Sequence, residues 1–193
     1  TGNKRYRILL VSGKPLNNIN YFVPLIKSIE NNCFEKNYEL FQYTYNASKT
    51  PFKEVSDYIN ELKADGIVAI ECFDKDFINK LINLGKPVCF NDFCTAEIRT
   101  DKNYDIIATN DEQSISGIVR ALYSKNRTER FTFVGDWRHC RSFQKRYNGM
   151  IAGILSSGGT HSRSEDIFCS DEVFNYGSLD ALKTEILKLK YRP

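Results

Sequence analysis

The strongest constraint on the fold of this chain is the alternation of short apolar runs with amphipathic segments. Apolar runs typical of buried strands occupy residues 5–13, 38–45, 66–71, 87–92, 105–109, 131–136 and 166–170. Between them, apolar side chains recur at the three/four spacing of a helix at 20–34, 51–66, 74–85, 110–124, 142–154 and 178–190. Continuous apolar strands that alternate with helices predict an α/β fold, with parallel sheets covered by helices on both faces.

Two residues refine the predicted helix ends. Pro24 is compatible with helix 20–34 only in the first turn, where a proline removes no helical hydrogen bond. Gly85 is placed to end helix 74–85 in the left-handed conformation that glycine favours.

A polar segment at residues 124–131 interrupts the alternation and predicts two lobes. We expect a complete N-terminal lobe over residues 5–126 and the beginning of a C-terminal lobe over residues 127–193. This second part supplies two strands and two helices, and the chain ends where the pattern would continue with another strand. Because so few elements bury little core, we expect a folded first lobe with a loosely held remainder.

Composition narrows the functional classes. The formal net charge is +3 with basic residues spread along the chain, which is too weak a signal to indicate nucleic-acid binding by itself. No apolar stretch reaches membrane-spanning length, and no signal segment opens the chain. The six cysteines include no Cys-x-x-Cys pair, and with only two histidines the sequence argues against a zinc site. We therefore expect reduced thiols, a cytoplasmic protein and no cofactor, while a Cys89–Cys94 disulfide remains open.

Candidate ligand residues follow from a general property of parallel sheets, which bind ligands beyond the carboxyl ends of their strands. Amides, carboxylates, an arginine and aromatic rings gather at these predicted ends and suit a neutral polyhydroxylated ligand such as a sugar. The alternative is that the Asn and Asp residues form turns and helix caps. The candidates are Asn18, Tyr21, Phe22, Phe73, Asp74, Asn91, Asp92, Asp136, Trp137 and Arg146.

Arg146 stands out because it lies at the edge of the apolar stripe of helix 142–154. It could snorkel along the core toward water, or it could hold a ligand. Catalytic motifs are lacking, since no dinucleotide fingerprint, phosphate loop or nucleophile elbow occurs. His139 and Cys140 are adjacent and would point apart, so we predict that the protein is not an enzyme.

The order of segments resembles the effector-binding region of the LacI/GalR family of bacterial transcription regulators, related in fold to periplasmic sugar-binding proteins. The resemblance covers nearly the whole chain from Arg5 onward. It is carried by YFVPLIKSIE, ADGIVAI, GKPVCFND, IIATNDEQSISGIVRAL, RFTFVGD and SFQKRYNGMIAGILSSGG, in the family's order and spacing.

The resemblance implies roles for particular residues. In that family an arginine three residues before a glycine, in the first helix of the second lobe, reaches ligand hydroxyls, and Arg146-Tyr147-Asn148-Gly149 matches that pattern. The sequence departs from the family at Ile19-Asn20-Tyr21-Phe22, Asn110-Asp111 and Arg127-Thr128, which leaves the identity of the ligand open.

Several functions fit these observations. The leading expectation is the ligand-sensing domain of a regulator that binds a small effector, a carbohydrate, between two lobes and so modulates DNA binding. Its DNA-binding headpiece would lie upstream of this chain, and we expect a homodimer formed partly through helix 20–34. The alternatives are the substrate-binding protein of a sugar ABC transporter, or an arabinose-type regulator with a different headpiece.

Overall fold

The computed structural model describes residues 5–13, 22–46, 49–126, 130–168 and 179–188. The chain divides into two compact units, Thr1–Ala108 and Thr109–Pro193. We refer to them as the first and the second unit.

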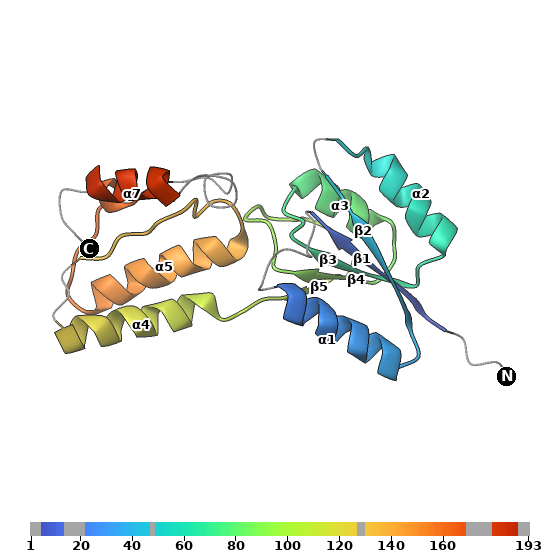
Figure 1. Ribbon diagram of the computed structural model, residues 1–193, viewed down its shortest axis with the longest axis horizontal. Coiled ribbons are helices and arrows are strands. Elements are labelled where there is room, and N and C mark those ends of the chain that lie inside the picture. Colours follow the sequence, from blue (N-terminus) through green and yellow to red (C-terminus); the bar gives the residue numbers. More distant parts are fainter. Residues whose placement is uncertain (1–4, 14–21, 47–48, 127–129, 169–178, 189–193) are drawn as a thin grey trace. The chain divides into compact units, whose positions relative to one another are not determined.

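The first unit is built on one parallel sheet (Figure 1). Its strand order is β2-β1-β3-β4-β5, and every neighbouring pair is parallel. The expected strands are present with slightly shorter bounds. They are β1 (Arg7–Ser12), β2 (Glu39–Thr44), β3 (Gly66–Ile70), β4 (Val88–Asn91) and β5 (Asp105–Ile107).

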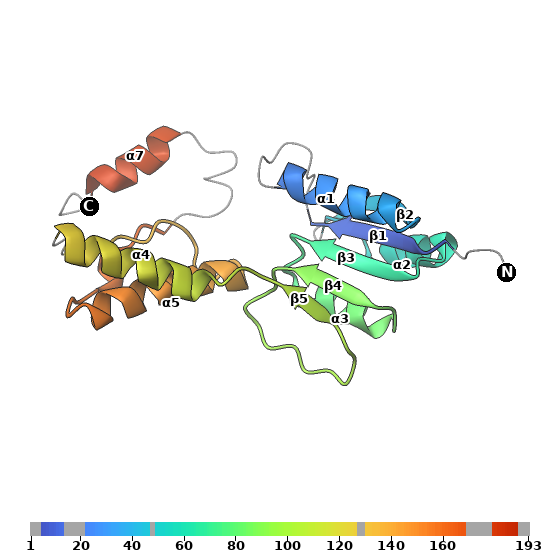
Figure 2. The same cartoon turned by 90° about the horizontal axis from the view of Figure 1, so that it is seen from below.

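Helices cover both faces of this sheet, as the apolar strands predicted (Figure 2). They are α1 (Phe22–Glu35), α2 (Phe52–Leu62) and α3 (Lys75–Asn83). Side chains alternate along a strand, so Leu9 of β1 packs in the cluster that includes residues of α2 and α3. Leu10 faces the other way and packs with Phe22 and Leu25 of α1.

The helix ends of the first unit follow local rules. Pro24 is the third residue of α1 and so lies in its first turn, as expected. Gly85 follows the C-cap of α3 with a φ of 70°, which confirms the predicted left-handed stop. The missing amide of Pro24 is thus tolerated in the first turn, and the positive φ after α3 is met by a glycine.

The second unit is centred on α4 (Asp111–Asn126) and α5 (Arg141–Ser156), which lie side by side (Figure 1). Val119 of α4 packs with Tyr147, Met150 and Ile154 of α5 in one apolar cluster. Gly153 makes this possible, because a Cβ there would lie 2.7 Å from the Cβ of Val119. Two shorter elements follow, η1 (Arg163–Glu165) and α7 (Leu179–Lys188).

Two expectations for the second unit need correction. The predicted strands 131–136 and 166–170 meet, within the described residues, only at a single parallel bridge between Val134 and Ile167. Hydrogen bonds from Ile167 to Phe133 and from Gly135 to Ile167 complete that contact. A strand needs neighbours to form a ladder, and among the described residues each of these two segments pairs only with the other.

The position of the division also differs from expectation. It lies between Ala108 and Thr109, whereas the polar segment placed the lobe boundary after residue 126. The physical reason is that α4 packs on α5, so the helix before the polar segment belongs to the second unit.

The cysteines of the described residues are thiols, including Cys89 and Cys94, so the structure contains no disulfide between those two. Cys72 is 5% exposed. Burial, and then the nearby Glu71 charge, raises the pKa of its thiol from 9.0 to about 12. Cys72 is therefore an unreactive core residue.

Candidate functional site

The carboxyl ends of two neighbouring strands carry residues in the left-handed backbone conformation. Glu71, directly after β3, has a φ of 56°, and Asp92, directly after β4, has a φ of 64°. For a residue with a Cβ this conformation costs roughly 1–2 kcal/mol, and such strain gathers at functional positions. Because β3 and β4 are parallel neighbours, both residues lie at the edge where the sequence predicts a ligand.

Two predicted ligand carboxylates at this edge bind the backbone. Asp74 caps α3, and its Oδ1 accepts a hydrogen bond from the Phe77 amide at 2.7 Å. The Oδ1 of Asp92 accepts a hydrogen bond from the Phe93 amide, also at 2.7 Å. These contacts are the cap and turn roles that the sequence left open as the alternative to ligand binding.

The other predicted residues of the first unit differ in exposure. Phe73 and Asn91 are half-buried, and Asn91 is the last residue of β4. Phe22 is 6% exposed and packs with Leu10 and Ile70, so its ring belongs to the core of the unit. The predicted ligand residues Asn18 and Tyr21 lie outside the described residues.

In the second unit the predicted residues Asp136 and Trp137 form a turn before α5. The Oδ1 of Asp136 accepts hydrogen bonds from the backbone amide and the Nε of Arg138, at 2.9 and 3.3 Å. The Trp137 ring stacks on Tyr147 with centroids 5.4 Å apart. The guanidinium carbon of Arg163 lies 5.3 Å from the Trp137 ring centroid, close enough for a cation–π contact.

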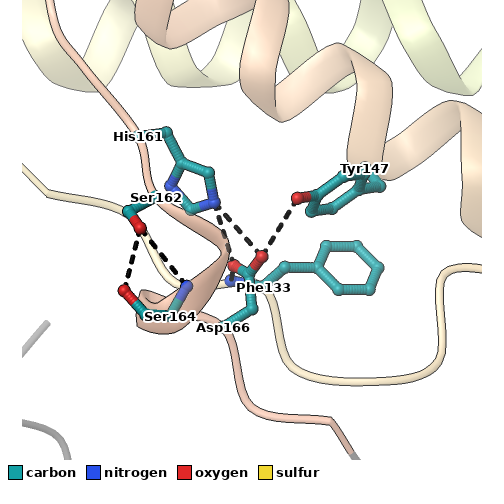
Figure 3. Close-up of polar contacts among 6 residues, drawn as sticks. All are labelled: Phe133, Tyr147, His161, Ser162, Ser164 and Asp166. Atoms are coloured by element: carbon teal, nitrogen blue, oxygen red, sulfur yellow. Dashed lines mark hydrogen bonds and ion pairs between the residues drawn. The ribbon is translucent and has the colours of Figure 1, made fainter.

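A polar cluster around Asp166 ties together three segments of the second unit (Figure 3). Asp166 accepts hydrogen bonds from the Phe133 amide at 3.0 Å and the Tyr147 hydroxyl at 3.1 Å, and His161 Nε2 lies 3.2 Å away. Burial, and then the Asp166 charge, raises the pKa of Tyr147 above 10.0, which keeps its hydroxyl protonated as a donor. We interpret these hydrogen bonds as stabilising the second unit alongside its small apolar core.

The Arg146 side chain does not only extend along the core to water, because it also pairs with a carboxylate of its own unit. Its Nε donates to Oδ1 of Asp111, the first residue of α4, at 3.0 Å. The Asp111 side chain is 9% exposed, whereas that of Arg146 is 43% exposed. One edge of the guanidinium is therefore anchored inside the unit, while the side chain remains open to solvent. This geometry suits an arginine that holds oxygen atoms of a ligand.

Sequence reasoning missed three residues of this neighbourhood: Asp111, Arg163 and Asp166. Asp111 and Arg146 are 35 positions apart, so no local spacing links them. The departure at Asn110-Asp111 was the one available signal, because it marked an unusual residue at a helix start. Within the described part of the chain, no group of three or more His, Cys, Asp or Glu side chains could hold a metal ion.

Comparisons with known proteins place this geometry in context. No known family profile matches the sequence, and no curated protein matches it either. In the described part of the chain, no helix combines the length and apolar character needed to cross a membrane.

Solved structures, in contrast, match well. A LacI transcriptional regulator from Bacillus cereus subsp. cytotoxis has a TM-score of 0.80 at 15% identity, covering 98% of this chain and 66% of its own. A complex of the transcriptional regulator CelR with cellobiose has a TM-score of 0.76 at 11% identity, covering 96% and 57%. The Cra transcriptional dual regulator from Pseudomonas putida in complex with fructose 1-phosphate has a TM-score of 0.68 at 14% identity, covering 94% and 63%.

This chain thus spans about three fifths of the length of those three solved chains. Identities of 11–15% are too low to carry residue roles across, so the comparison concerns the fold. Further matches include a regulatory protein of the LacI family from Chloroflexus aggregans. The described part of this chain therefore has the α/β fold found in transcription regulators of the LacI family.

Proposed function

We propose that this chain is the ligand-sensing part of a LacI-type transcription regulator and that its effector is a small carbohydrate. The effector would bind partly through Arg146, and its binding would alter DNA contacts made by a headpiece outside these 193 residues. We also place the protein in the cytoplasm. An effector can act in this way only if it binds two arrangements of the regulator with unequal affinity.

The observation that carries the proposal is Arg146 itself. Its side chain is 43% exposed, and its Nε donates a hydrogen bond to Asp111. The fold of the chain matches those of regulators solved with cellobiose and with fructose 1-phosphate. Trp137 and Asp136 lie in the turn before the same helix and would supply a ring face and a carboxylate. Asn91 and Asp92, at the carboxyl edge of the sheet in the first unit, remain separate candidate ligand residues of that unit.

Titration calorimetry tests this role of Arg146. A panel of monosaccharides, disaccharides and sugar phosphates identifies the effector, and Arg146→Ala should then weaken its binding more than tenfold. A charge-assisted hydrogen bond contributes roughly 1.5–3 kcal/mol, and tenfold corresponds to about 1.4 kcal/mol.

The matched control is Arg99→Ala, which removes an exposed arginine paired with Glu97 in the first unit. Arg99→Ala should leave effector affinity unchanged. If Arg146→Ala also binds the effector with full affinity, the proposed site is refuted.

DNA binding provides a second test. With a net charge of +3, this chain alone should form no sequence-specific complex in gel shifts at physiological salt. A discrete band would contradict the assignment of DNA contacts to a separate headpiece.

The proposed homodimer has less support from α1 than the sequence suggested. Phe22, Leu25 and Ile26 are used in the core of the first unit. Val23 and Phe34, which are 40% and 85% exposed, are the apolar residues of α1 left for a partner surface. Sedimentation equilibrium of Phe34→Ser should show weaker self-association than the unaltered chain, and an unchanged dimer would exclude this face.

A further inference from the structure

Arg146 is fixed on two sides by its own unit. Its Nε donates to Oδ1 of Asp111, and its guanidinium carbon lies 5.6 Å from the centre of the Phe143 ring. A guanidinium has five N–H donors, of which Nε–H is one. No hydrogen bond joins its two Nη groups to another described residue, and the side chain is 43% exposed. Among the described residues, the four other donors of this guanidinium thus have no hydrogen-bond partner and are open to a ligand.

Asp111 occupies a costly position. Its side chain is 9% exposed, and its Oδ2 is buried without a hydrogen-bond partner among the described residues. An unsatisfied buried acceptor costs roughly 1–3 kcal/mol, and more when the group is charged. A neutral side chain here would avoid that cost. The carboxylate is therefore expected to do something for Arg146 that a neutral residue cannot.

The glycine three residues after Arg146 explains how Asp111 reaches it. A Cβ at Gly149 would collide with the backbone oxygen of Glu112, the residue that follows Asp111. Glycine at position 149 thus lets the first turn of α4 approach α5 closely enough for the ion pair. The Arg-x-x-Gly spacing and the Asp111 carboxylate form one structural arrangement.

We infer that Asp111 is a positioning residue for Arg146 and that it makes the site favour neutral hydroxylated ligands over anionic ones. The inference rests on the proposed function of Arg146. Holding the guanidinium plane reduces the entropy lost when the side chain grips two ligand oxygens. Pairing also brings the net charge of the two residues to zero, so a phosphate ester gains less from Arg146 than from an unpaired cation.

The Arg146 Nε–H resonance, in protein labelled with ¹⁵N at arginine, reports both effects before the effector is known. Arg146→Lys assigns the signal by its disappearance. In the unaltered protein the Nε proton should exchange slowly with water, and inorganic phosphate should leave the signal unshifted. In Asp111→Asn the Nε proton should exchange at least about tenfold faster, because loss of a charge-assisted hydrogen bond corresponds to about that factor. Phosphate should shift the signal of this variant.

Two further variants make the experiment decisive. Asp57→Asn removes a carboxylate paired with Lys53 in the first unit and should leave the Arg146 signal unchanged. Asp111→Ser also removes the charge, but with a smaller side chain. Comparing the melting temperatures of the two variants then shows whether the asparagine side chain itself disturbs folding. Equal phosphate shifts in the unaltered protein and in both Asp111 variants, or unchanged Nε exchange in both, would overturn the inference.

The same variants separate this inference from the proposed function. Once calorimetry has identified an effector, Asp111→Asn should bind it about tenfold more weakly and should shift preference toward the corresponding sugar phosphate. If Arg146→Ala leaves effector affinity intact, the proposed function fails. The resonance data would then still decide whether Asp111 holds Arg146.

Discussion

The two units of this chain are stabilised in different ways. The first unit has a five-stranded parallel sheet with apolar clusters on both faces, and its buried residues include Phe77, Phe90 and Leu9. In the second unit the described residues form two packed helices, one bridge between extended segments and a cluster of four buried apolar residues. There, glycines between the helices and the half-buried Asp166 carboxylate take over part of the role that apolar packing has in the first unit.

The difference teaches where each unit is sensitive to change. The first unit depends on large apolar side chains, so it should respond most to cavities. The second depends on close backbone approach and on satisfied polar groups, so it should respond most to added atoms and lost acceptors. The predictions below test that contrast, from the largest expected effect to the smallest.

Removal of a large core ring should affect only the first unit. Phe77 is 1% exposed, stacks on Tyr45 with ring centroids 3.8 Å apart and meets Phe52 edge-on. Phe77→Ala should lower the free energy of unfolding of that unit by about 4 kcal/mol. Amide hydrogen exchange should show lost protection in β1 and β3, with α4 and α5 serving as the internal reference. Equal loss in both units would mean that they unfold together and would end the contrast.

One added methyl group should damage the second unit. In Gly149→Ala the new Cβ would meet the Glu112 backbone, which cannot move away cheaply, so we expect a loss of about 2.5 kcal/mol. The matched control is Gly117→Ala in α4, where a Cβ would have nothing within 4 Å. That variant should be stabilised by about 1 kcal/mol, since alanine favours helix. Urea denaturation followed by circular dichroism measures both, and equal behaviour of the two variants would contradict the close-approach argument.

Loss of one carboxylate should loosen the three segments that it joins. In Asp166→Asn the side chain keeps a single acceptor oxygen for the Phe133 amide and the Tyr147 hydroxyl. We expect the second unit to lose about 2 kcal/mol. Asp136→Asn, the same change in the turn with Arg138, should cost roughly 0.5 kcal/mol. If thermal melts rank these two variants in the opposite order, Asp166 does not have the role assigned to it.

Alkaline pH should destabilise the folded chain through the buried thiol of Cys72 in the first unit. The pKa of Cys72 is raised from 9.0 to about 12 in the folded chain, so the unfolded chain loses this proton first as pH rises. Stability from this group is complete below pH 9 and is lost as pH rises toward 12. Near pH 10 the loss should be about 1.4 kcal/mol, the equivalent of one pKa unit. In Cys72→Ala the free energy of unfolding should not show this loss between about pH 8 and pH 10. If the variant and the unaltered chain lose the same free energy over this range, the prediction is wrong.

The first unit could largely be predicted from the sequence, because its strands are continuous apolar runs and its helices have one-sided apolar spacing. GIVAI became β3 and the segment that ends at Gly85 became α3, since local pattern and tertiary burial agree there. The second unit was harder. Residues 131–136 have the composition of a strand, but the Phe133 amide donates to Asp166 instead of entering a ladder.

The candidate site was predicted only in part, for the same reason. Arg146 could be singled out because it sits at the edge of an apolar stripe in its own helix. Its partner Asp111 lies on another helix and is brought close by Gly149, a relation that no local pattern contains. Asp74 and Phe22 show the opposite case, since a cap and a core ring occupy positions that also suit a ligand.

The strand order of the first unit has a consequence for synthesis on the ribosome. The first strand, β1, lies between β2 and β3, so both of its neighbours have been made once residue 70 has been added. Each later strand then joins the edge left by the one before it, β4 on β3 and β5 on β4. The helices α2 and α3 that link these parallel strands are made before the strand that follows each of them. The nascent chain can therefore extend its sheet in the order of translation, without threading a later strand between earlier ones.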